Sequence, residues 1–151
     1  CLGVGPIKIV RAVAALEPVP ARLEIIKQGE LTLLNDSFNS NPTGFREAVE
    51  TASLIKSKYR VLITPGIVDL GAKNQEIHKG LGKLAAKVFD LVILVTDSGR
   101  TRGLEQGLLS AKFEKEMIVF APTLNEAMQI LREKARLGTL VLIENDLPDN
   151  Y

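Results

Sequence analysis

Hydrophobic and polar positions near the start of the chain indicate a short helix followed by a linker. Apolar residues recur at helical spacing after Pro6, which suits the first position of a helix. Pro18 and Pro20 then end the helix and stiffen the connection. A proline-bearing joint is typical of a domain boundary. We therefore predict that residues 1–20 are the end of a preceding domain and a linker, and that residues 21–151 form one domain.

Beyond the linker, short apolar runs alternate with longer amphipathic stretches. The first two runs flank Gln28-Gly29, as in a hairpin, and a later run is almost wholly apolar, as in parallel sheets buried on both faces. The predicted strands are residues 23–26, 31–34, 61–64, 91–96, 117–120 and 140–143, and the predicted helices are residues 43–58, 75–88, 103–112 and 123–136. This order predicts an α/β domain with a mostly parallel, Rossmann-like sheet of about six strands, an N-terminal antiparallel hairpin and helices on both faces.

The composition is that of an ordinary soluble globular domain. The 151 residues are 46% hydrophobic and 25% charged, and 19 basic residues nearly cancel 18 acidic ones, for a net charge of +1. This balance gives no attraction to nucleic acid or to an anionic membrane, and no apolar run approaches the roughly 20 residues that span a bilayer. The single cysteine, Cys1, excludes an internal disulfide and suits a reducing compartment, so we expect a cytoplasmic protein.

Polar residues gather in the loops that follow the predicted strands, where open α/β sheets bind ligands. In the first such loop, Asp36 can accept hydrogen bonds from sugar hydroxyls, and Asn39 and Asn41 offer both donors and acceptors. The alternative is local, because Asn41 before Pro42 is also a good helix cap and asparagine readily forms turns. Further polar segments at residues 65–74, 97–102 and 144–151 should lie on the same edge.

Three other features have a functional and a purely structural interpretation. Arg22 can reach a phosphate or a ribose, or it is a solvated surface residue. His78 is the only histidine and lacks the partners that a zinc site requires, so we expect no metal site, and a surface or half-buried position is the alternative to a binding role. Residues 96–100 can hold an anion through backbone amides and Arg100, or they form a turn of small polar residues.

The usual signatures of a complete catalytic site are absent. The sequence contains no phosphate-binding G-x-x-x-x-G-K-[ST], no G-x-G-x-x-G opening a helix, and no G-x-S-x-G. No nucleophile–base pair is apparent, so we assign no catalytic residue and interpret the chain as half of a site. Because the chain has no initiating methionine, we expect Cys1 to be a cut point in a longer protein that carries the rest.

Three motifs resemble the Mur ligases, and the similarity covers nearly the whole chain. L-E-P-V-P-A-R-L-E at residues 16–24 resembles the L-x-P-V-P-G-R-L-E junction before the C-terminal domain of that family. N-D-S-F-N-S-N-P at residues 35–42 resembles the D-D-S-Y-N-A-N-P of the branch that adds D-alanyl-D-alanine to UDP-N-acetylmuramoyl tripeptide. Asp69-Leu70-Gly71, followed by His78, resembles the E-L-G and downstream histidine of the same branch.

The resemblance implies an ATP-dependent, ADP-forming ligase of peptidoglycan biosynthesis with three domains. The N-terminal domain binds the UDP end of the substrate, and the central domain carries most of the site for ATP and Mg²⁺. The C-terminal domain closes over ATP and brings in the acceptor. The substrate carboxylate becomes an acyl phosphate, which the acceptor amine attacks to form an amide. The partners are then UDP-N-acetylmuramoyl peptide, D-alanyl-D-alanine and the protein's own central and N-terminal domains, and the fragment alone is expected to be inactive.

The resemblance also implies roles for particular residues. Arg22 and Asp36 contact the nucleotide, with Asp36 on the ribose, while Asn39 and Asn41 shape the neighbouring loop. The loop around Asp69, together with His78, faces the substrates.

Two departures from the family pattern concern the acceptor. Pro65-Gly66 stands where the family has Gly-Asp, and Glu144-Asn145-Asp146 stands where the branch shows K-G-S-R. Glu144 and Asp146 are therefore candidate substrate-binding residues in an acidic loop, with weaker attraction for an acceptor carboxylate. The alternatives are another Mur-superfamily ligase, adding a single amino acid or a glutamate tail, and a non-catalytic module that binds a nucleotide or a protein.

Overall fold

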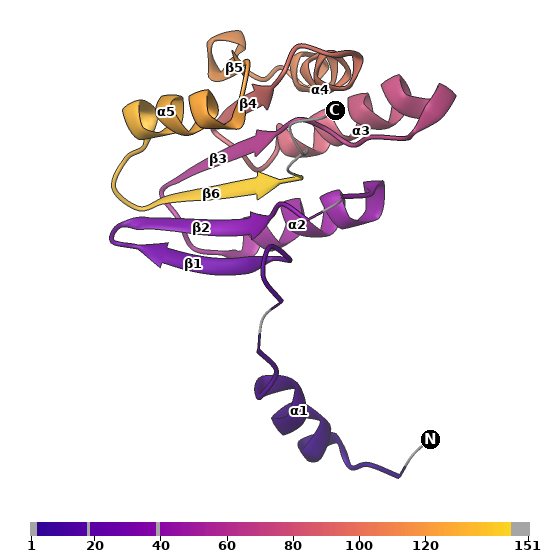
Figure 1. The fold of residues 1–151 in the computed structure, drawn as a ribbon, viewed down its shortest axis with the longest axis vertical. Helices are drawn as coiled ribbons and strands as arrows, with labels where there is room; N and C mark the ends of the chain where they lie inside the picture. The colour runs from indigo at the N-terminus through magenta and orange to yellow at the C-terminus, as the bar shows by residue number, and fades with distance from the viewer. Residues whose placement is uncertain (1–2, 18, 39, 146–151) are drawn as a thin grey trace.

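The fold is built on one mixed sheet. The computed structural model describes residues 3–17, 19–38 and 40–145. The strands are β1 (Glu24–Gln28), β2 (Leu31–Asp36), β3 (Tyr59–Thr64), β4 (Leu91–Val95), β5 (Ile118–Ala121) and β6 (Thr139–Glu144). They form a 6-stranded sheet in the order β1-β2-β6-β3-β4-β5 (Figure 1). The β1–β2 pair is antiparallel and the other pairs are parallel, which confirms the predicted sheet and its hairpin.

Helices cover both faces of the sheet. They are α2 (Pro42–Leu54), α3 (Asn74–Ala85), α4 (Gly99–Ser110) and α5 (Leu124–Lys134). A further helix, α1 (Pro6–Ala14), lies apart from the sheet (Figure 1), and short 3-10 turns occur at Gly71–Lys73 and Lys115–Met117. Helices α2, α3 and α4 bury one face of the sheet, and α5 packs on the other. The reason is handedness. Right-handed crossovers that advance along the sheet place helices on one face, and the return from β5 to β6 places α5 opposite.

Strand β6 occupies the position that matters most for the site. Although it is last in the sequence, it lies between β2 and β3 and pairs in parallel with both. The chain crosses over this position between β2 and β3 and fills it only when it returns from β5, so residues from distant parts of the sequence meet at the carboxyl ends of these strands, where open α/β sheets bind ligands.

Two helices differ most from their predicted bounds, each by four residues at one end. Helix α4 begins at Gly99 rather than at residue 103, because Ser98 and Thr101 form a reciprocal capping box. Helix α2 ends at Leu54 rather than at residue 58. There the Arg60 guanidinium donates hydrogen bonds to the carbonyl oxygens of Ala52 at 3.2 Å and Ile55 at 3.0 Å, which satisfies the open helix end.

Helices α3 and α4 pack at unusually close range through glycines. A Cβ added to Gly107 would overlap the carbonyl oxygen of Lys79 and lie 2.9 Å from the Cα of Gly82. A Cβ on Gly103 would lie 2.8 Å from the Cβ of His78. The absence of side chains at these positions lets the two backbones approach and places His78 between the helices and the sheet.

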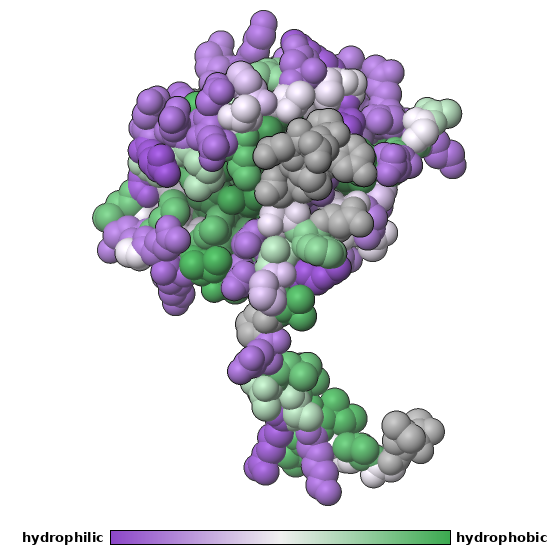
Figure 2. All heavy atoms as spheres, viewed as in Figure 1, coloured by the Kyte–Doolittle hydropathy of each residue, from purple (hydrophilic) through white to green (hydrophobic). Residues whose placement is uncertain are grey.

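Helix α1 lies apart from the sheet at the far end of the linker (Figure 1). It has no buried residue, although its sequence is amphipathic, and apolar side chains gather on it in the space-filling view (Figure 2). The exposed apolar residues of this segment include Ile7, Val10 and Val13, which are 60–71% exposed. The apolar stripe that predicted the helix thus has no partner within the described residues. No helix among those residues has the length and apolar character needed to cross a membrane.

Candidate functional site

The carboxyl ends of β2, β6 and β3 lie side by side and bring the predicted polar loops together. Asp36 at the end of β2 is paired in register with Glu144 at the end of β6, and β6 in turn pairs with β3, which ends at Thr64. The loop after β2, residues 37–41, and the loop after β3, residues 65–70, leave this edge of the sheet. The candidate site therefore lies at the carboxyl ends of the strands, where the sequence predicts the polar loops.

Asp36 and Arg22 line one pocket at this edge. The pocket has a volume of about 220 Å³ and also includes Phe38, Ser40 and Asn41 in its walls. The Oδ1 atom of Asp36 accepts a hydrogen bond from the Leu23 backbone N–H at 3.1 Å, and the Arg22 guanidinium lies 4.4 Å from the centre of the Phe38 ring. Burial raises the pKa of the Asp36 carboxyl, while the Leu23 N–H and the charge of Arg22 oppose that rise.

Asn41 acts as the N-cap of α2. Its Oδ1 accepts hydrogen bonds from the backbone N–H groups of Thr43 and Gly44, each at 3.0 Å. The capping interpretation of Asn41 is therefore confirmed, and its side-chain oxygen is held by the helix while the residue still lines the pocket. Asn39, the other asparagine predicted for this loop, lies outside the described residues.

The prediction that Glu144 belongs to an acidic loop after the last strand is wrong. Glu144 is the final residue of β6, and its side chain is 0% exposed. One carboxyl oxygen forms a short hydrogen bond with the Ser40 hydroxyl, and the other accepts from Thr64 Oγ1 at 3.3 Å. Burial, with a smaller contribution from the negative charge of Asp36, raises the pKa of Glu144 to about 8 against the lowering effect of these two hydrogen bonds. Asp146, predicted with it, lies outside the described residues.

Asn145 extends these contacts and was missed as a candidate residue. Its backbone N–H donates to the Asp36 carbonyl at 3.1 Å, and its Nδ2 donates to the Gly66 carbonyl at 2.7 Å. The backbone of Asn145 adopts a φ of 59°, in the left-handed region that asparagine tolerates better than most residues. Ser40 and Thr64 were also missed. All three residues are recognisable only in the tertiary structure, which brings them together at the end of β6.

His78 is fully buried, and both of its ring nitrogens are engaged. Nε2 accepts a hydrogen bond from the Ile67 backbone N–H at 2.9 Å, so the proton of the neutral ring is on Nδ1, which donates to the Asn74 carbonyl at 2.8 Å. Burial lowers the pKa of His78, and nearby Arg100 lowers it further against the Asn74 hydrogen bond. The surface or half-buried position expected as the alternative is wrong. The structure gives His78 the role of holding the loop after β3.

The remaining polar loops are held by local contacts. Arg100 donates from Nε to the Pro65 carbonyl at 3.3 Å, which ties the N-terminal turn of α4 to the loop after β3. Asp97 and Arg102 form an exposed ion pair with an oxygen–nitrogen distance of 2.6 Å. Asp69 is exposed near the tip of the 65–70 loop and has a φ of 60°. The loop thus presents Asp69 outward while His78 and Arg100 hold its base.

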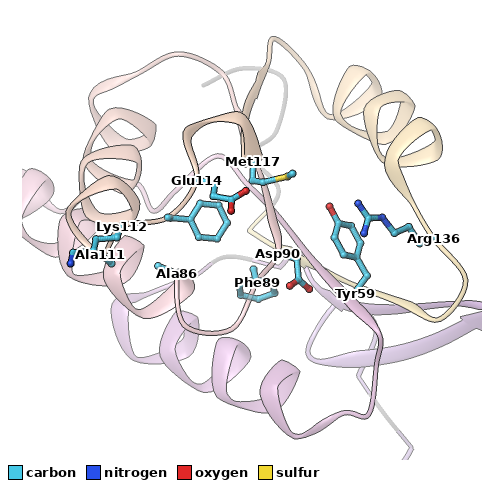
Figure 3. A pocket seen from close by; sticks show the side chains of 10 residues that line it. Tyr59, Ala86, Phe89, Asp90, Ala111, Lys112, Glu114, Met117 and Arg136 are labelled. Carbon is cyan, nitrogen blue, oxygen red and sulfur yellow. The ribbon is translucent and has the colours of Figure 1, made fainter.

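A larger pocket, of about 370 Å³, lies at the opposite edge of the sheet (Figure 3). Its walls include Tyr59, Phe89, Asp90 and Arg136, and the Arg136 guanidinium lies 4.4 Å from the centre of the Tyr59 ring. None of the residues singled out in the sequence lines it. We place the candidate site at the smaller pocket, because it lies at the carboxyl ends of the strands, where this kind of sheet binds ligands.

Comparisons with known proteins agree with the resemblance. The chain is 26% identical over 145 residues to the UDP-N-acetylmuramoyl-tripeptide–D-alanyl-D-alanine ligase of Bacillus subtilis (strain 168), covering 94% of this chain and 31% of the relative. It is 27% identical over 153 residues to the UDP-N-acetylmuramoyl-L-alanyl-D-glutamate–2,6-diaminopimelate ligase of Aquifex aeolicus (strain VF5), covering 99% of this chain and 30% of the relative.

A solved structure shares the fold and gives the same picture of length. The MurF ligase from Thermotoga maritima in complex with ADP matches with a TM-score of 0.72 and 17% identity, over 93% of this chain and 33% of that one. This chain therefore spans about a third of the length of the proteins it matches. Residues 21–144 match the family described as "Mur ligase, glutamate ligase domain". The chain belongs to the Mur ligase family, and this region is the family's C-terminal domain.

Proposed function

We propose that this chain is the C-terminal domain of an ATP-dependent, ADP-forming ligase that adds D-alanyl-D-alanine to UDP-N-acetylmuramoyl tripeptide. The motif at residues 35–42, which resembles the one in the dipeptide-adding branch, supports this choice of acceptor, as does the similarity to the Bacillus subtilis ligase. In such a reaction the tripeptide carboxylate takes the γ-phosphoryl group of ATP and ADP leaves. The acceptor amine then displaces phosphate, and an amide forms.

The observation that carries the proposal is the meeting of Arg22 and Asp36 in one pocket at the carboxyl ends of the strands. Arg22 precedes β1 and Asp36 ends β2, so both lie at the open end of the hairpin, where the Leu23 N–H holds the Asp36 carboxyl in place. A carboxylate accepts hydrogen bonds from the two hydroxyls of a ribose, and a guanidinium pairs with phosphate oxygens. We propose that Asp36 binds the ribose of ATP and that Arg22 lies toward its phosphates.

We propose that the loop of residues 65–70 faces the acceptor. Asp69 is exposed, so its carboxylate is available to the amine of an incoming dipeptide. His78 acts through the loop, because its ring nitrogens hold Ile67 and Asn74. Keeping an acyl phosphate from water requires a closed site, and orienting the amine supplies much of the rate. Both tasks suit a domain that closes over ATP from one side.

The remainder of the site is proposed to lie in the preceding domains. Among residues 3–17, 19–38 and 40–145, no group of three or more histidine, cysteine or acidic side chains is placed to hold a metal ion. We therefore assign Mg²⁺ and most ATP contacts to the central domain. We also propose that the exposed apolar face of α1 packs on that domain, with residues 15–20 as the hinge border.

A second candidate acceptor is a single amino acid. The chain is about as similar to a 2,6-diaminopimelate ligase, over 99% of its length, as to the dipeptide-adding ligase. Sequence identity therefore supports a single amino acid as strongly as it supports the dipeptide. Glu144, which stands in the family's K-G-S-R stretch, does not by itself disfavour an acceptor carboxylate, because it is buried with a raised pKa and presents no surface charge.

The test is ATP-dependent phosphate release by the full-length protein with UDP-N-acetylmuramoyl tripeptide. We expect release with D-alanyl-D-alanine and much less with single amino acids. Asp36→Ala should raise the KM for ATP on the order of tenfold, because hydrogen bonds to a charged group contribute about 1.5–3 kcal/mol. Glu50→Ala, which removes an exposed carboxylate on α2, is the control and should leave the KM unchanged. Release with another acceptor would move the substrate, and no release with any acceptor would refute the ligase.

A further inference from the structure

The end of β6 is connected by side-chain contacts to the loops on both of its sides. Glu144 contacts the Ser40 hydroxyl, which belongs to the loop after β2, and the Thr64 hydroxyl at the end of β3. Its neighbour, Asn145, repeats the arrangement. The backbone N–H of Asn145 reaches the Asp36 carbonyl, and its side chain reaches the Gly66 carbonyl. We call these two residues the β6 bridge.

We propose that the β6 bridge is a positioning device that couples the nucleotide-side loop, residues 36–41, to the acceptor-side loop, residues 64–70, with Glu144 acting as a neutral carboxylic acid. The inference rests on the proposed function for the assignment of one loop to the nucleotide and the other to the acceptor. The coupling itself rests on the contacts alone. Neither bridge residue needs to touch a substrate, so neither is catalytic.

The hydrogen bonds around Glu144 are complete when its carboxyl carries a proton. The Ser40 hydroxyl has a single proton and faces two acceptors, a Glu144 carboxyl oxygen and the Asn41 carbonyl, which is 3.4 Å from Ser40 Oγ. A proton on Glu144 lets the acid O–H donate to Ser40 Oγ and frees the Ser40 hydroxyl to donate to Asn41. On the other side, Thr64 Oγ1 accepts from the Gly66 N–H at 3.0 Å and donates to the second carboxyl oxygen. A continuous chain of donors and acceptors therefore runs from Asn41 to Gly66 through one carboxyl group.

The charges that surround the bridge favour this neutral form. From β2, the Asp36 carboxylate faces Glu144, and Arg22 lies on the far side of Asp36 in the pocket. From the β3 side, Thr64 is uncharged, and the His78 ring is neutral by its hydrogen bonds. From α4, Arg100 is turned to the Pro65 carbonyl.

Ionisation would therefore place a second negative charge beside Asp36, inside the sheet edge. Burial and this repulsion raise the pKa of Glu144 to about 8, so the neutral bridge persists at neutral pH and weakens above that value. A solvated surface glutamate would behave in the opposite way, with its charge present throughout that range.

Amide hydrogen exchange on the intact protein tests the coupling directly. In Glu144→Ala, the amides of both loops should exchange about tenfold faster, because each loop loses a hydrogen bond to the carboxyl group. In Glu144→Gln, which keeps the shape and the neutral charge, neither loop should change. Raising the pH through about 8 should speed both loops in the unmodified protein, after correction for intrinsic exchange, and neither in Glu144→Gln.

A one-sided substitution separates coupling from a general loss of stability. Ser40→Ala removes a contact on the nucleotide side only, and we expect faster exchange in the 64–70 loop as well. Ser53→Ala is the matched control, because its hydroxyl bonds to the Glu50 carbonyl at the other end of α2. The bridge is wrong if Ser40→Ala affects only its own loop, or if Glu144→Ala affects one loop or neither.

Kinetics then connect the bridge to the reaction. In Glu144→Ala, the KM values for ATP and for the acceptor should rise together. A rise in only one of them would overturn the coupling. In Glu144→Gln, both KM values should stay near those of the unmodified protein at neutral pH. Above about pH 8, both KM values should rise in the unmodified protein but not in Glu144→Gln. A protein that shows linked exchange of the two loops but releases no phosphate with any acceptor would keep the bridge and refute the proposed function.

Discussion

Two buried titratable residues hold the loops of the candidate site, and their pKa values shift in opposite directions. Burial lowers the pKa of His78 and raises that of Glu144, because burial disfavours the charged form of each. Both are therefore neutral at neutral pH, and both make hydrogen bonds that only the neutral form supplies in full. Each holds a loop through hydrogen bonds made below the protein surface. Exposed groups such as Asp69 are therefore the ones available to contact a ligand.

The pH dependence of stability should reveal His78. Its pKa in the folded protein lies below the ordinary value of 6.5, so its contribution to stability is present above that value and declines as the pH falls below it. Replacement by Gln should cost about 1–3 kcal/mol at neutral pH if Ile67 N–H loses its partner.

Urea unfolding at a series of pH values measures the difference in unfolding free energy between the unmodified protein and His78→Gln. That difference should shrink as the pH falls below 6.5. A difference that stays constant with pH would contradict a buried neutral histidine. Glu144 contributes with the opposite sign, because its raised pKa makes stability fall as the pH rises from about 4.5 to about 8. Comparing variants at each pH therefore separates the two groups.

At the scale of elements, the sheet edge depends on how closely α3 packs on α4. His78 on α3 and Arg100 on α4 both hold the loop after β3, so the distance between these helices sets the base of that loop. Glycines at the contact make the approach possible. The apolar pattern that predicts a helix does not reveal this close approach, because glycine contributes little to an amphipathic stripe.

Gly107→Ala should destabilise the protein by about 1–3 kcal/mol, because the new methyl group overpacks the contact between α3 and α4. Gly80→Ala is the matched control on α3, where an added Cβ meets nothing within 4 Å. That change should stabilise the helix by roughly 0.5–1 kcal/mol. Thermal or urea unfolding of the two variants gives both values, and equal effects would argue against close packing as the cause.

The bounds of the elements were predicted to within a few residues, with instructive exceptions. Helix α4 was predicted to begin late because its first turn is polar, and the Ser98–Thr101 capping box does not have the usual glutamate or glutamine in third place. Helix α2 was extended too far because Ile55 continues its apolar stripe. The carbonyls at its end are satisfied by Arg60, from the following strand, which local spacing cannot reveal.

For the whole molecule, the exposed apolar face of α1 is the clearest sign of a larger assembly. Residues such as Ile7 and Val13 are exposed on α1, and the relatives are about three times as long as this chain. Exposed apolar faces of this kind mark interaction surfaces. A contact between α1 and the preceding domain would fix one end of the linker and let the C-terminal domain move against it.

We expect the amides of α1 to be protected from hydrogen exchange in the full-length protein. Val10→Asp should remove that protection, because a buried unpaired charge is costly, whereas Lys8→Ala on the same helix should not. Both residues are exposed in the described chain, so the comparison isolates the apolar face. Unprotected α1 amides in the full-length protein would show that the helix has no partner there.

The amino-acid sequence by itself determined the order of strands and helices, the mixed sheet and the edge to which the polar loop after β2 belongs. Those features follow from periodicity, turn residues and the handedness of crossovers, which are local or general rules. It also indicated the family through its motifs. Arg22, Asp36 and Asn41 line one pocket because the hairpin and the first crossover link them over short stretches of chain.

Only the tertiary structure decided the state of Glu144 and His78. Residue Glu144 is 104 residues from Ser40 and 80 from Thr64, and it meets both because β6 inserts between β2 and β3. The same residue, Glu144, would be exposed as a charged carboxylate if β6 lay at an edge of the sheet. Burial, and with it the charge of a carboxyl group, is set by neighbours that are distant in sequence, so no local pattern can carry it.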